Sequence, residues 1–226
     1  MNNSKTLLPI LQHGDSFFPS GAISFSWGLE ALASDRKVCS ATELENFVSH
    51  QLLDRWASSD RAVICAVNCA SDNIDNAIEY DYLLEASCLA EEQRKGSKRM
   101  GSALLNVHAQ LGTEGAQNYQ NLVRSGSALG HVAVIQGILW TNLGINLDSM
   151  CVMAANSLAL NILSAGLRLG LIGHVDCQLI LGRMHNVIEK ILSSAVPKID
   201  EIHAYSPAAD IAMMRHEIQQ SRLFAN

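Results

Sequence analysis

The residue types that could perform metal or acid–base chemistry are scattered along the sequence. Among eight histidines no two lie four residues apart, and the six cysteines form no C-x-x-C pair. Cys65 and Cys69 share a helical face and could hold a soft metal, but two thiolates without a nearby histidine make half of a zinc site. His216-Glu217 begins like a zinc-protease helix, yet Gln220 stands where that motif needs its second histidine. The spacing therefore predicts no catalytic residue and no metal site within one chain.

Motifs for nucleotide binding and nucleophilic catalysis are missing as well. The sequence contains no Walker A motif, no G-x-G-x-x-G and no nucleophile elbow G-x-S-x-G. From the residues alone, two kinds of function stay open. One is an all-α enzyme whose site is assembled from distant residues, and the other is a helical module that binds a partner.

The composition predicts a folded, charge-poor protein. Hydrophobic residues make up 48% of the 226 residues and charged residues 17%, against about 25% charged in a typical soluble domain. With 16 Lys and Arg against 22 Asp and Glu, the net charge of −6 lacks the basic footprint of a nucleic-acid binder. The apolar run from Leu7 to Leu11 is too short for a secretory signal, so we expect a cytoplasmic protein with reduced thiols.

One segment, from Met150 to Gly173, is long enough to cross a membrane. Ser157, Asn161, Ser164 and Arg168 nevertheless recur along it at helical spacing and form a polar stripe on an apolar helix. That pattern is typical of a central helix in a soluble protein, so no membrane contact is expected. Because a buried guanidinium needs partners, we expect Arg168 to pair with an acidic residue of another helix or to line a polar cavity.

The elements that must position these residues are predicted to be helices, with little or no sheet. Ser40-x-x-Glu43 is a capping box at one helix start, and scarce proline favours long helices. Further helices are expected at about residues 60–70, 87–112, 114–125, 130–143, 147–169 and 174–193. We therefore expect a single-domain, all-α bundle of about eight to ten helices, with its core in residues 1–204 and a flexible N-terminus.

Residues 205–226 are predicted to form a separate docking element. Ser206-Pro207 is a helix start, with serine as the N-cap and proline at the first helical position. Ile211, Met214 and Ile218 then form a narrow apolar stripe on a helix too short to be stable alone in water. We expect this helix to be loose in the free protein and to become ordered on a partner chain.

Four blocks of sequence, in one order along the chain, carry a resemblance. The segment from Asp15 to Glu30 contains Pro19, Gly21, Ser26, Gly28 and Glu30. A charged stretch from Glu92 ends in Met-Gly-x-x-Leu-Leu, and a later block holds Arg168 and Gly170. The C-terminal block supplies the candidate partner-binding residues Tyr205, Ser206, Pro207, Asp210, Ile211, Met214, His216, Glu217, Arg222, Leu223 and Phe224. Together, these blocks resemble the UreF family of urease accessory proteins.

This resemblance implies a dimeric, non-enzymatic scaffold. A UreF-like core would bind the accessory protein UreD, also called UreH, and through that complex the GTPase UreG, to deliver nickel to apo-urease. Nickel and GTP would be handled by the partner complex, with neither bound tightly by this chain. The N-terminal and Arg168–Gly170 motifs would then have structural or assembly roles. The sequence departs from the family pattern at Ala22-Ile23, Leu171 and His174, and a helical binding module unrelated to nickel remains the alternative.

Overall fold

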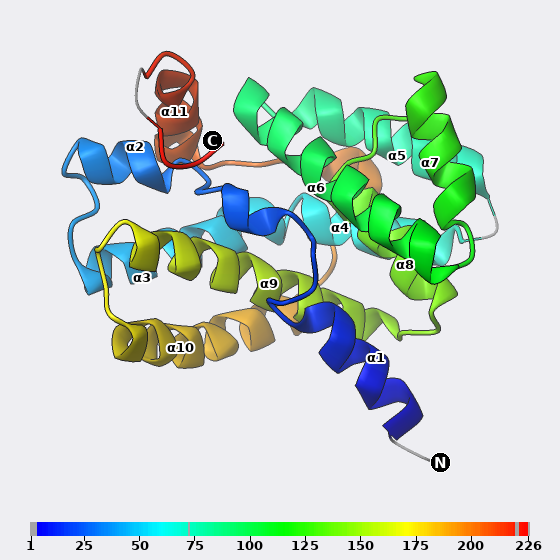
Figure 1. Ribbon diagram of the computed structural model, residues 1–226, viewed down its shortest axis with the longest axis horizontal. Coiled ribbons are helices and arrows are strands. Elements are labelled where there is room, and N and C mark those ends of the chain that lie inside the picture. The colour runs from blue at the N-terminus through cyan, green and yellow to red at the C-terminus, as the bar shows by residue number, and fades with distance from the viewer. Residues whose placement is uncertain (1–3, 72, 220–221, 226) are drawn as a thin grey trace.

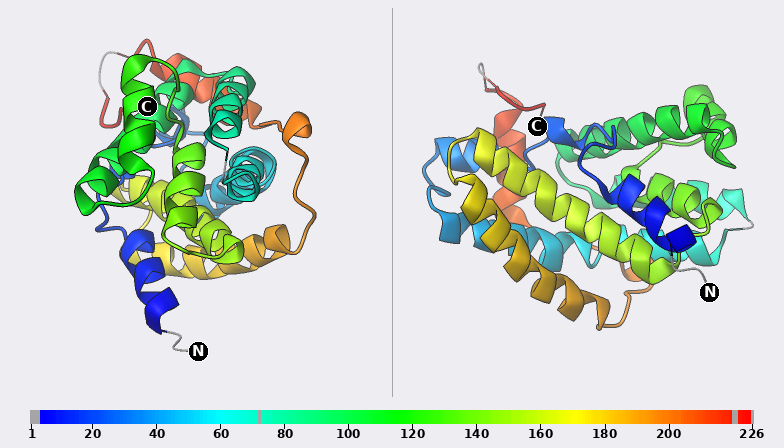
Figure 2. Two further views of the ribbon diagram at one scale, coloured as in Figure 1. Left: turned by 90° about the vertical axis from the view of Figure 1, so that its right-hand side faces the viewer. Right: turned by 60° about the horizontal axis from the view of Figure 1, so that its bottom comes forward.

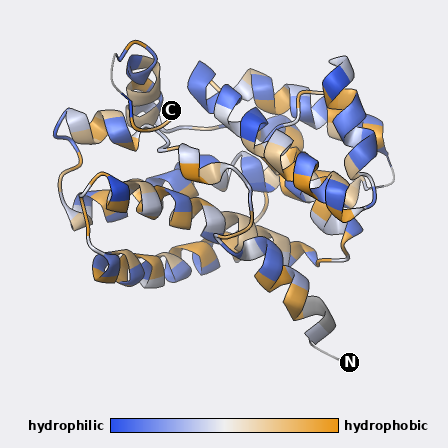
Figure 3. Cartoon of the chain, viewed as in Figure 1, coloured by the Kyte–Doolittle hydropathy of each residue, from blue (hydrophilic) through white to orange (hydrophobic). Residues whose placement is uncertain are grey.

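The computed structural model describes residues 4–71, 73–219 and 222–225, and this part of the chain is helical with no strand (Figure 1). Within these described residues, eleven α-helices share one contiguous hydrophobic core. The predicted all-α, single-domain fold is therefore confirmed, with one helix more than the eight to ten expected. Figure 3 shows polar and apolar residues alternating along most helices, as expected where an apolar stripe faces a core.

The helices follow one another with short connections. The first six are α1 (Ser4–Gly14), α2 (Leu29–Ser34), α3 (Ala41–His50), α4 (Asp60–Cys69), α5 (Ile74–Ser87) and α6 (Glu91–Leu111). The others are α7 (Ala116–Ser125), α8 (Val132–Asn142), α9 (Leu147–Arg168), α10 (His174–Leu192) and α11 (Pro207–His216). Three short elements complete the fold, namely the 3₁₀ turns Ala22–Ser24 and Ile199–Glu201 and the π-helical segment Gln51–Trp56.

Two groups of helices make up the body. Helix α9 packs against α1, α3, α4, α8 and α10, and α10 also contacts α3. A second group, α5 to α8, gathers on the right of Figure 1, where α8 packs against both α4 and α6. Figure 2 shows α11 leading the C-terminal end back across the body beside α2. Distant parts of the sequence are thus brought together around α2, α6 and α9.

Helix α9 is the segment that sequence analysis considered as a membrane span. Within the described part of the chain, it is the one helix that is long and apolar enough to cross a membrane. Most of this helix is nevertheless buried inside the protein. Its polar residues Ser157, Asn161 and Ser164 line a cavity beside the helix. The helix therefore has the interior position that its stripe predicted.

The N-terminal segment, which was expected to be flexible, contains helix α1. This helix packs against α9, with Ile10 against the core and His13 buried, while Leu7, Leu8 and Leu11 are exposed. Pro9 lies within it although proline removes a helix donor. The contact with α9 supplies a packing partner that the short apolar run did not indicate. Residues 1–3 lie outside the described residues.

Candidate functional site

Residues from all four sequence blocks meet where the C-terminal segment packs back on the body. Helix α11 contacts α2, which carries Glu30, and α6, which carries Glu92. Phe224, beyond α11, packs beside the end of α9, where Arg168 lies. We call this place the tail junction and define it by Glu30, Glu92, His216, Arg222 and the Leu223–Phe224 backbone.

The centre of the tail junction is the imidazole of His216, which is completely buried. Its Nε2 lies 3.0 Å from a carboxylate oxygen of Glu30, and its Nδ1 lies 3.0 Å from a carboxylate oxygen of Glu92. Both ring nitrogens of His216 thus lie within hydrogen-bond distance of a carboxylate, one from α2 and one from α6. The imidazole therefore links α11 to two other helices inside the protein.

The same two carboxylates hold the chain beyond α11. Glu30 accepts hydrogen bonds from the backbone N–H groups of Leu223 and Phe224, at 2.7 and 3.0 Å. The guanidinium of Arg222 donates to Glu92 at 3.1 Å. Besides the histidine of α11, Glu30 therefore binds two backbone N–H groups of the tail and Glu92 binds one side chain, so the tail is attached at several points.

A tight turn before α2 places Glu30 in this position. Gly28 has φ +84°, and a Cβ there would lie 2.9 Å from the carbonyl oxygen of Ala209 in α11. Glycine is thus required both by the left-handed backbone and by the close approach of α11. The buried hydroxyl of Ser26 accepts from the backbone N–H of Glu30 at 3.4 Å. Two signature residues of this block, Ser26 and Gly28, thus build the turn that positions Glu30.

Arg168 lies at the exposed end of α9 and differs from both sequence-based expectations. Its guanidinium stacks 4.1 Å from the ring centre of Phe224 and donates to the backbone carbonyl of Ile23. No acidic partner is found among the described residues, and Arg168 is not part of the cavity wall formed by the rest of its stripe. The reason is that the last turn of α9 reaches the surface, where the ring of Phe224 covers it.

The predicted apolar stripe of the C-terminal helix faces outward. Ile211, Met214 and Ile218 are 57%, 43% and 84% exposed, whereas Ala209, Ala212 and Met213 are buried against the body. The expectation of a loosely attached helix was based on this narrow stripe and on the short length of the helix. The structure instead attaches the helix through its opposite, alanine-rich face and through the tail junction, leaving the stripe uncovered in the single chain.

The remaining candidate residues have supporting positions around these contacts. Tyr205 is exposed, and its backbone N–H donates to the carbonyl of Asp54. Ser206 and Pro207 begin α11 at the predicted positions, although the buried Ser206 hydroxyl makes no capping hydrogen bond. Burial raises the pKa of Asp210 in the first turn of this helix. Glu217 accepts a hydrogen bond from Arg222 through its backbone carbonyl. Pro19 and Gly21 belong to the loop beside the cavity, and Gly170, at φ +72°, follows the end of α9.

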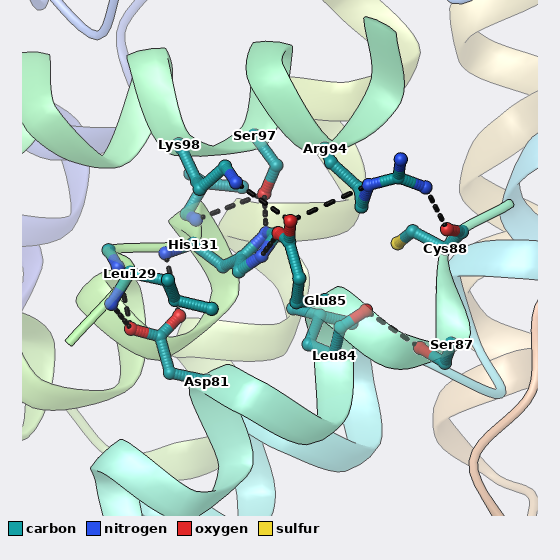
Figure 4. Close-up of polar contacts among 12 residues, drawn as sticks. Asp81, Leu84, Glu85, Ser87, Cys88, Arg94, Ser97, Lys98, Leu129 and His131 are labelled. Atoms are coloured by element: carbon teal, nitrogen blue, oxygen red, sulfur yellow. Dashed lines mark hydrogen bonds and ion pairs between the residues drawn. The ribbon is translucent and has the colours of Figure 1, made fainter. Parts of the chain in front are cut away.

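A second buried polar cluster, which sequence analysis did not find, surrounds the start of α8 (Figure 4). The buried carboxylate of Asp81 accepts from the backbone N–H groups of Leu129, Gly130 and His131, at 2.8, 2.6 and 2.8 Å. It also accepts from the hydroxyl of Tyr119 at 3.1 Å. Asp81 thus satisfies donors at a helix start that has no side-chain cap of its own. We call this cluster, with Glu85, Ser97 and His131, the α8 cradle.

The α8 cradle contains a serine, a histidine and an acid in contact, a combination that occurs in hydrolases. Figure 4 shows His131 between them, with Nδ1 at 3.0 Å from Ser97 Oγ and Nε2 at 2.7 Å from Glu85. Ser97 is only 7% exposed, and its hydroxyl already accepts from the backbone N–H of Val132. A hydroxyl enclosed in this way cannot attack a substrate, so the arrangement supports a structural role.

Possible metal ligands are dispersed in the folded protein. Among the described residues, no group of three or more His, Cys, Asp or Glu side chains is arranged as metal ligands would be. The thiol of Cys65 lies 3.9 Å from that of Cys151, while Cys69 is exposed. Helical spacing suggested Cys65 with Cys69, whereas the fold places Cys65 beside Cys151.

Comparisons with known proteins agree with the block pattern. The family model UreF matches residues 38–185. A urease accessory protein UreF of Photorhabdus laumondii is 31% identical over 99% of this chain and 100% of its own length. Proteins of the same name from Yersinia enterocolitica and Trichodesmium erythraeum are each 30% identical, over 99% and 97% of this chain and 100% and 96% of their own lengths.

Proposed function

Since the chain belongs to the UreF family of urease accessory proteins, we propose that it is a scaffold and chaperone subunit in the GTP-dependent assembly of the nickel centre of urease. The observation that carries this proposal is the similarity to UreF proteins over nearly the whole chain. The proposed partners are a UreD- or UreH-like accessory protein, a UreG-like GTPase and apo-urease. Nickel is the cargo of this complex, and GTP is the substrate of the GTPase.

The C-terminal helix supports a particular docking face for the UreD-like partner. Its outer stripe of Ile211, Met214 and Ile218 is exposed, and Leu223 and Tyr205 add further exposed apolar surface nearby along the chain. Apolar side chains grouped on one helix face gain free energy when a partner removes them from water. Because the tail junction already fixes the helix on the body, little ordering would oppose binding at this face.

The proposal also includes the cellular setting and the oligomeric state. We propose a cytoplasmic protein that forms a homodimer, because helical surfaces with apolar residues commonly associate by two-fold symmetry. Light scattering at micromolar concentration tests the dimer. A mass that stays at the monomer value of 24.5 kDa even at high concentration would exclude it.

Co-purification with UreD- and UreG-like proteins tests the function directly. The full chain is compared with a chain ending at Tyr205 and with the double variant Met214→Glu, Ile218→Glu. We expect the full chain to recover both partners and to support nickel-dependent urease activation. Both altered chains should lose the UreD-like protein, because one lacks the stripe and the other carries charges on it.

A matched control introduces the same charge elsewhere. Val175 in α10 is as exposed as the stripe residues but lies outside the C-terminal block, so Val175→Glu should retain full partner binding. Undiminished recovery of the UreD-like protein by the stripe variant would move the docking face to the helical body. Failure of the full chain to recover either partner or to activate urease would favour a binding module unrelated to nickel.

A further inference from the structure

A cavity of about 610 Å³ lies beside α9, enclosed partly by the loop from Asp15 to Ile23. Its volume is within the range of small-molecule sites in proteins. The chain has three tryptophans, and all of them, Trp27, Trp56 and Trp140, line this cavity. Gln136 and the polar residues of α9 contribute hydrogen-bonding groups to the same wall. Aromatic surfaces with a few polar groups are the usual lining of a site for a small organic molecule.

Arg55 is the charged side chain in this wall that is most deeply buried, at 2% exposure. Its Nε donates to Gln51 at 3.0 Å, its Nη1 donates to Asp60 at 2.9 Å, and its guanidinium lies 4.6 Å from the ring centre of Trp27. The buried Nη2 has no hydrogen-bond partner among the described residues. Buried donors are nearly always satisfied in folded proteins, so this nitrogen, on a residue of the cavity wall, calls for a partner from outside the described residues.

Two unusual backbone conformations place Arg55 against Trp27. Arg55 belongs to the π-helical segment Gln51–Trp56, and such turns occur frequently at functional sites. Trp27 has φ +58°, a left-handed conformation that is strained for a residue with a bulky side chain. Strain of this kind persists where surrounding contacts enforce it, often at ligand sites. Both irregularities thus occur at the part of the cavity wall that carries the unsatisfied donor.

The charges around Arg55 indicate which chemical group would accept from it. Asp60 already forms an ion pair with the guanidinium. Asp210 is a second buried carboxylate near Arg55: burial raises the pKa of Asp210, and the positive charge of Arg55 partly opposes that rise. A further carboxylate in the ligand would place excess negative charge in a buried site. A neutral carbonyl oxygen can accept the hydrogen bond without adding charge, and an attached N–H can donate to Asp60, which has unused acceptor capacity.

We propose that this cavity binds a small molecule with a neutral carboxamide group and an apolar body. The carbonyl oxygen accepts from Nη2 of Arg55, the amide N–H donates to Asp60, and the apolar body lies against the tryptophans. This site is separate from the tail junction and does not depend on the proposed role in urease assembly.

The indole N–H signals of the three tryptophans provide a direct NMR test in the full chain. Benzamide and benzoate are titrated as a matched pair that differs in the amide and carboxylate groups. We expect benzamide to shift the indole signals in a saturable manner and benzoate to bind about tenfold more weakly or not at all. Equal or tighter binding of benzoate would overturn the amide assignment. The absence of saturable shifts with either compound would mean that the cavity holds water only, which also overturns the proposal.

Substitutions assign the binding to Arg55. Arg55→Gln should weaken benzamide at least tenfold, since a charged donor is lost, whereas Arg124→Gln, on the exposed surface of α7, should have no effect. Should Arg55→Gln fail to fold, Ala154→Leu provides a second test. Ala154 lines the cavity from α9, and the larger side chain should exclude benzamide. Unchanged binding to either folded variant would contradict the proposed site.

Discussion

The α8 cradle and the tail junction are built from the same chemical parts. In each, one carboxylate accepts backbone N–H groups from an irregular segment: Asp81 from residues 129–131, and Glu30 from residues 223 and 224. Each also contains a completely buried histidine in contact with an acid, His131 with Glu85 and His216 with Glu30 and Glu92. A basic side chain completes each cluster, Lys98 in the cradle and Arg222 in the junction.

The two clusters differ in what they connect. The cradle joins α5, α6 and the start of α8, and α8 in turn packs against α4, α5 and α6. The junction joins residues 30 and 92 to the segment of residues 216–224, whose helix α11 packs against α2 and α6. The hydrogen bonds of the α8 cradle should therefore stabilise the whole protein against unfolding. The similar bonds of the tail junction should mainly hold the C-terminal segment in place. The following predictions test this difference, beginning with the largest effect.

Replacing Asp81 by alanine should cause the largest loss of stability. Three backbone N–H groups at the start of α8 and the hydroxyl of Tyr119 would lose their acceptor inside the protein. Each buried donor left without an acceptor costs about 1–3 kcal/mol, so the lost bonds together should cost more than ~3 kcal/mol, which urea unfolding would measure as a lower midpoint. Asp75→Ala, in the exposed first turn of the same helix α5, is the control and should cost less than ~1 kcal/mol. Similar effects of the two substitutions would mean that the cradle does not hold the body together.

A further buried histidine, His108, sharpens the comparison because none of the described acidic residues forms an ion pair with it. His108 stacks on His13 at 4.9 Å, and its Nδ1 lies 2.9 Å from the hydroxyl of Thr113. Burial, with a smaller effect from the charge of His13, lowers the pKa of His108 from 6.5 to about 4. This ring is therefore neutral in the folded protein near neutral pH.

The lowered pKa of His108 predicts a loss of stability in acid. Below pH 6.5 the unfolded chain binds a proton that the folded chain excludes until about pH 4. The free energy of unfolding therefore keeps its full contribution from the neutral His108 ring above pH 6.5. It loses about 3 kcal/mol in total as the pH falls from 6.5 to 4. His108→Gln can retain a hydrogen bond to Thr113 and should show a shallower decline in the unfolding free energy over this range. Parallel pH profiles for the two proteins would contradict this origin of acid sensitivity.

At the tail junction, Glu92→Gln should release the C-terminal segment and leave the body folded. The substitution removes the charge that faces both His216 and Arg222, and hydrogen bonds to charged groups contribute about 1.5–3 kcal/mol. Faster amide hydrogen exchange confined to residues after 206 is the expected result. The neighbouring substitution Glu91→Gln breaks only an exposed pair with Lys95 and should change exchange little. Uniformly faster exchange throughout the body would show that the junction and the cradle have the same role.

Local sequence patterns predict the parts of both regions that depend on neighbours along the chain. Ser40 caps its helix as predicted, with the backbone N–H of Glu43 donating to its hydroxyl, while the Glu43 carboxylate accepts from the backbone N–H of Cys39. Helix α9 ends one residue before the predicted boundary. The helix expected at 87–112 begins at Glu91, since Ser87 instead ends α5. Helices α1, α2 and α5 were not predicted, because their formation depends on packing against distant helices.

The polar contacts of the two clusters could not be predicted in the same way. Glu30 and His216 are 186 residues apart, and Asp81 and Gly130 are 49 apart. No pattern along the chain indicates which acid faces which histidine, because that pairing depends on how the helices cross. The resemblance to a family singled out Glu30, His216 and Arg222 as motif residues. It gave no indication of the α8 cradle, whose residues fall largely outside the four blocks.

Arg168→Ala should have the smallest effect on stability and therefore separates attachment of the tail from packing of the body. The guanidinium is exposed and stacks on Phe224, and exposed cation–π contacts contribute about 0.5–1 kcal/mol. Helical circular dichroism should show a nearly unchanged melting temperature, while exchange near Phe224 rises and recovery of the UreD-like partner falls. Arg168→Lys retains the positive charge but loses the planar stack, so it should show an intermediate loss. A loss of about 3 kcal/mol in the free energy of unfolding would instead be typical of a buried charge pair. The end of α9 would then contribute to the stability of the body, as the α8 cradle does, and not only to attachment of the tail.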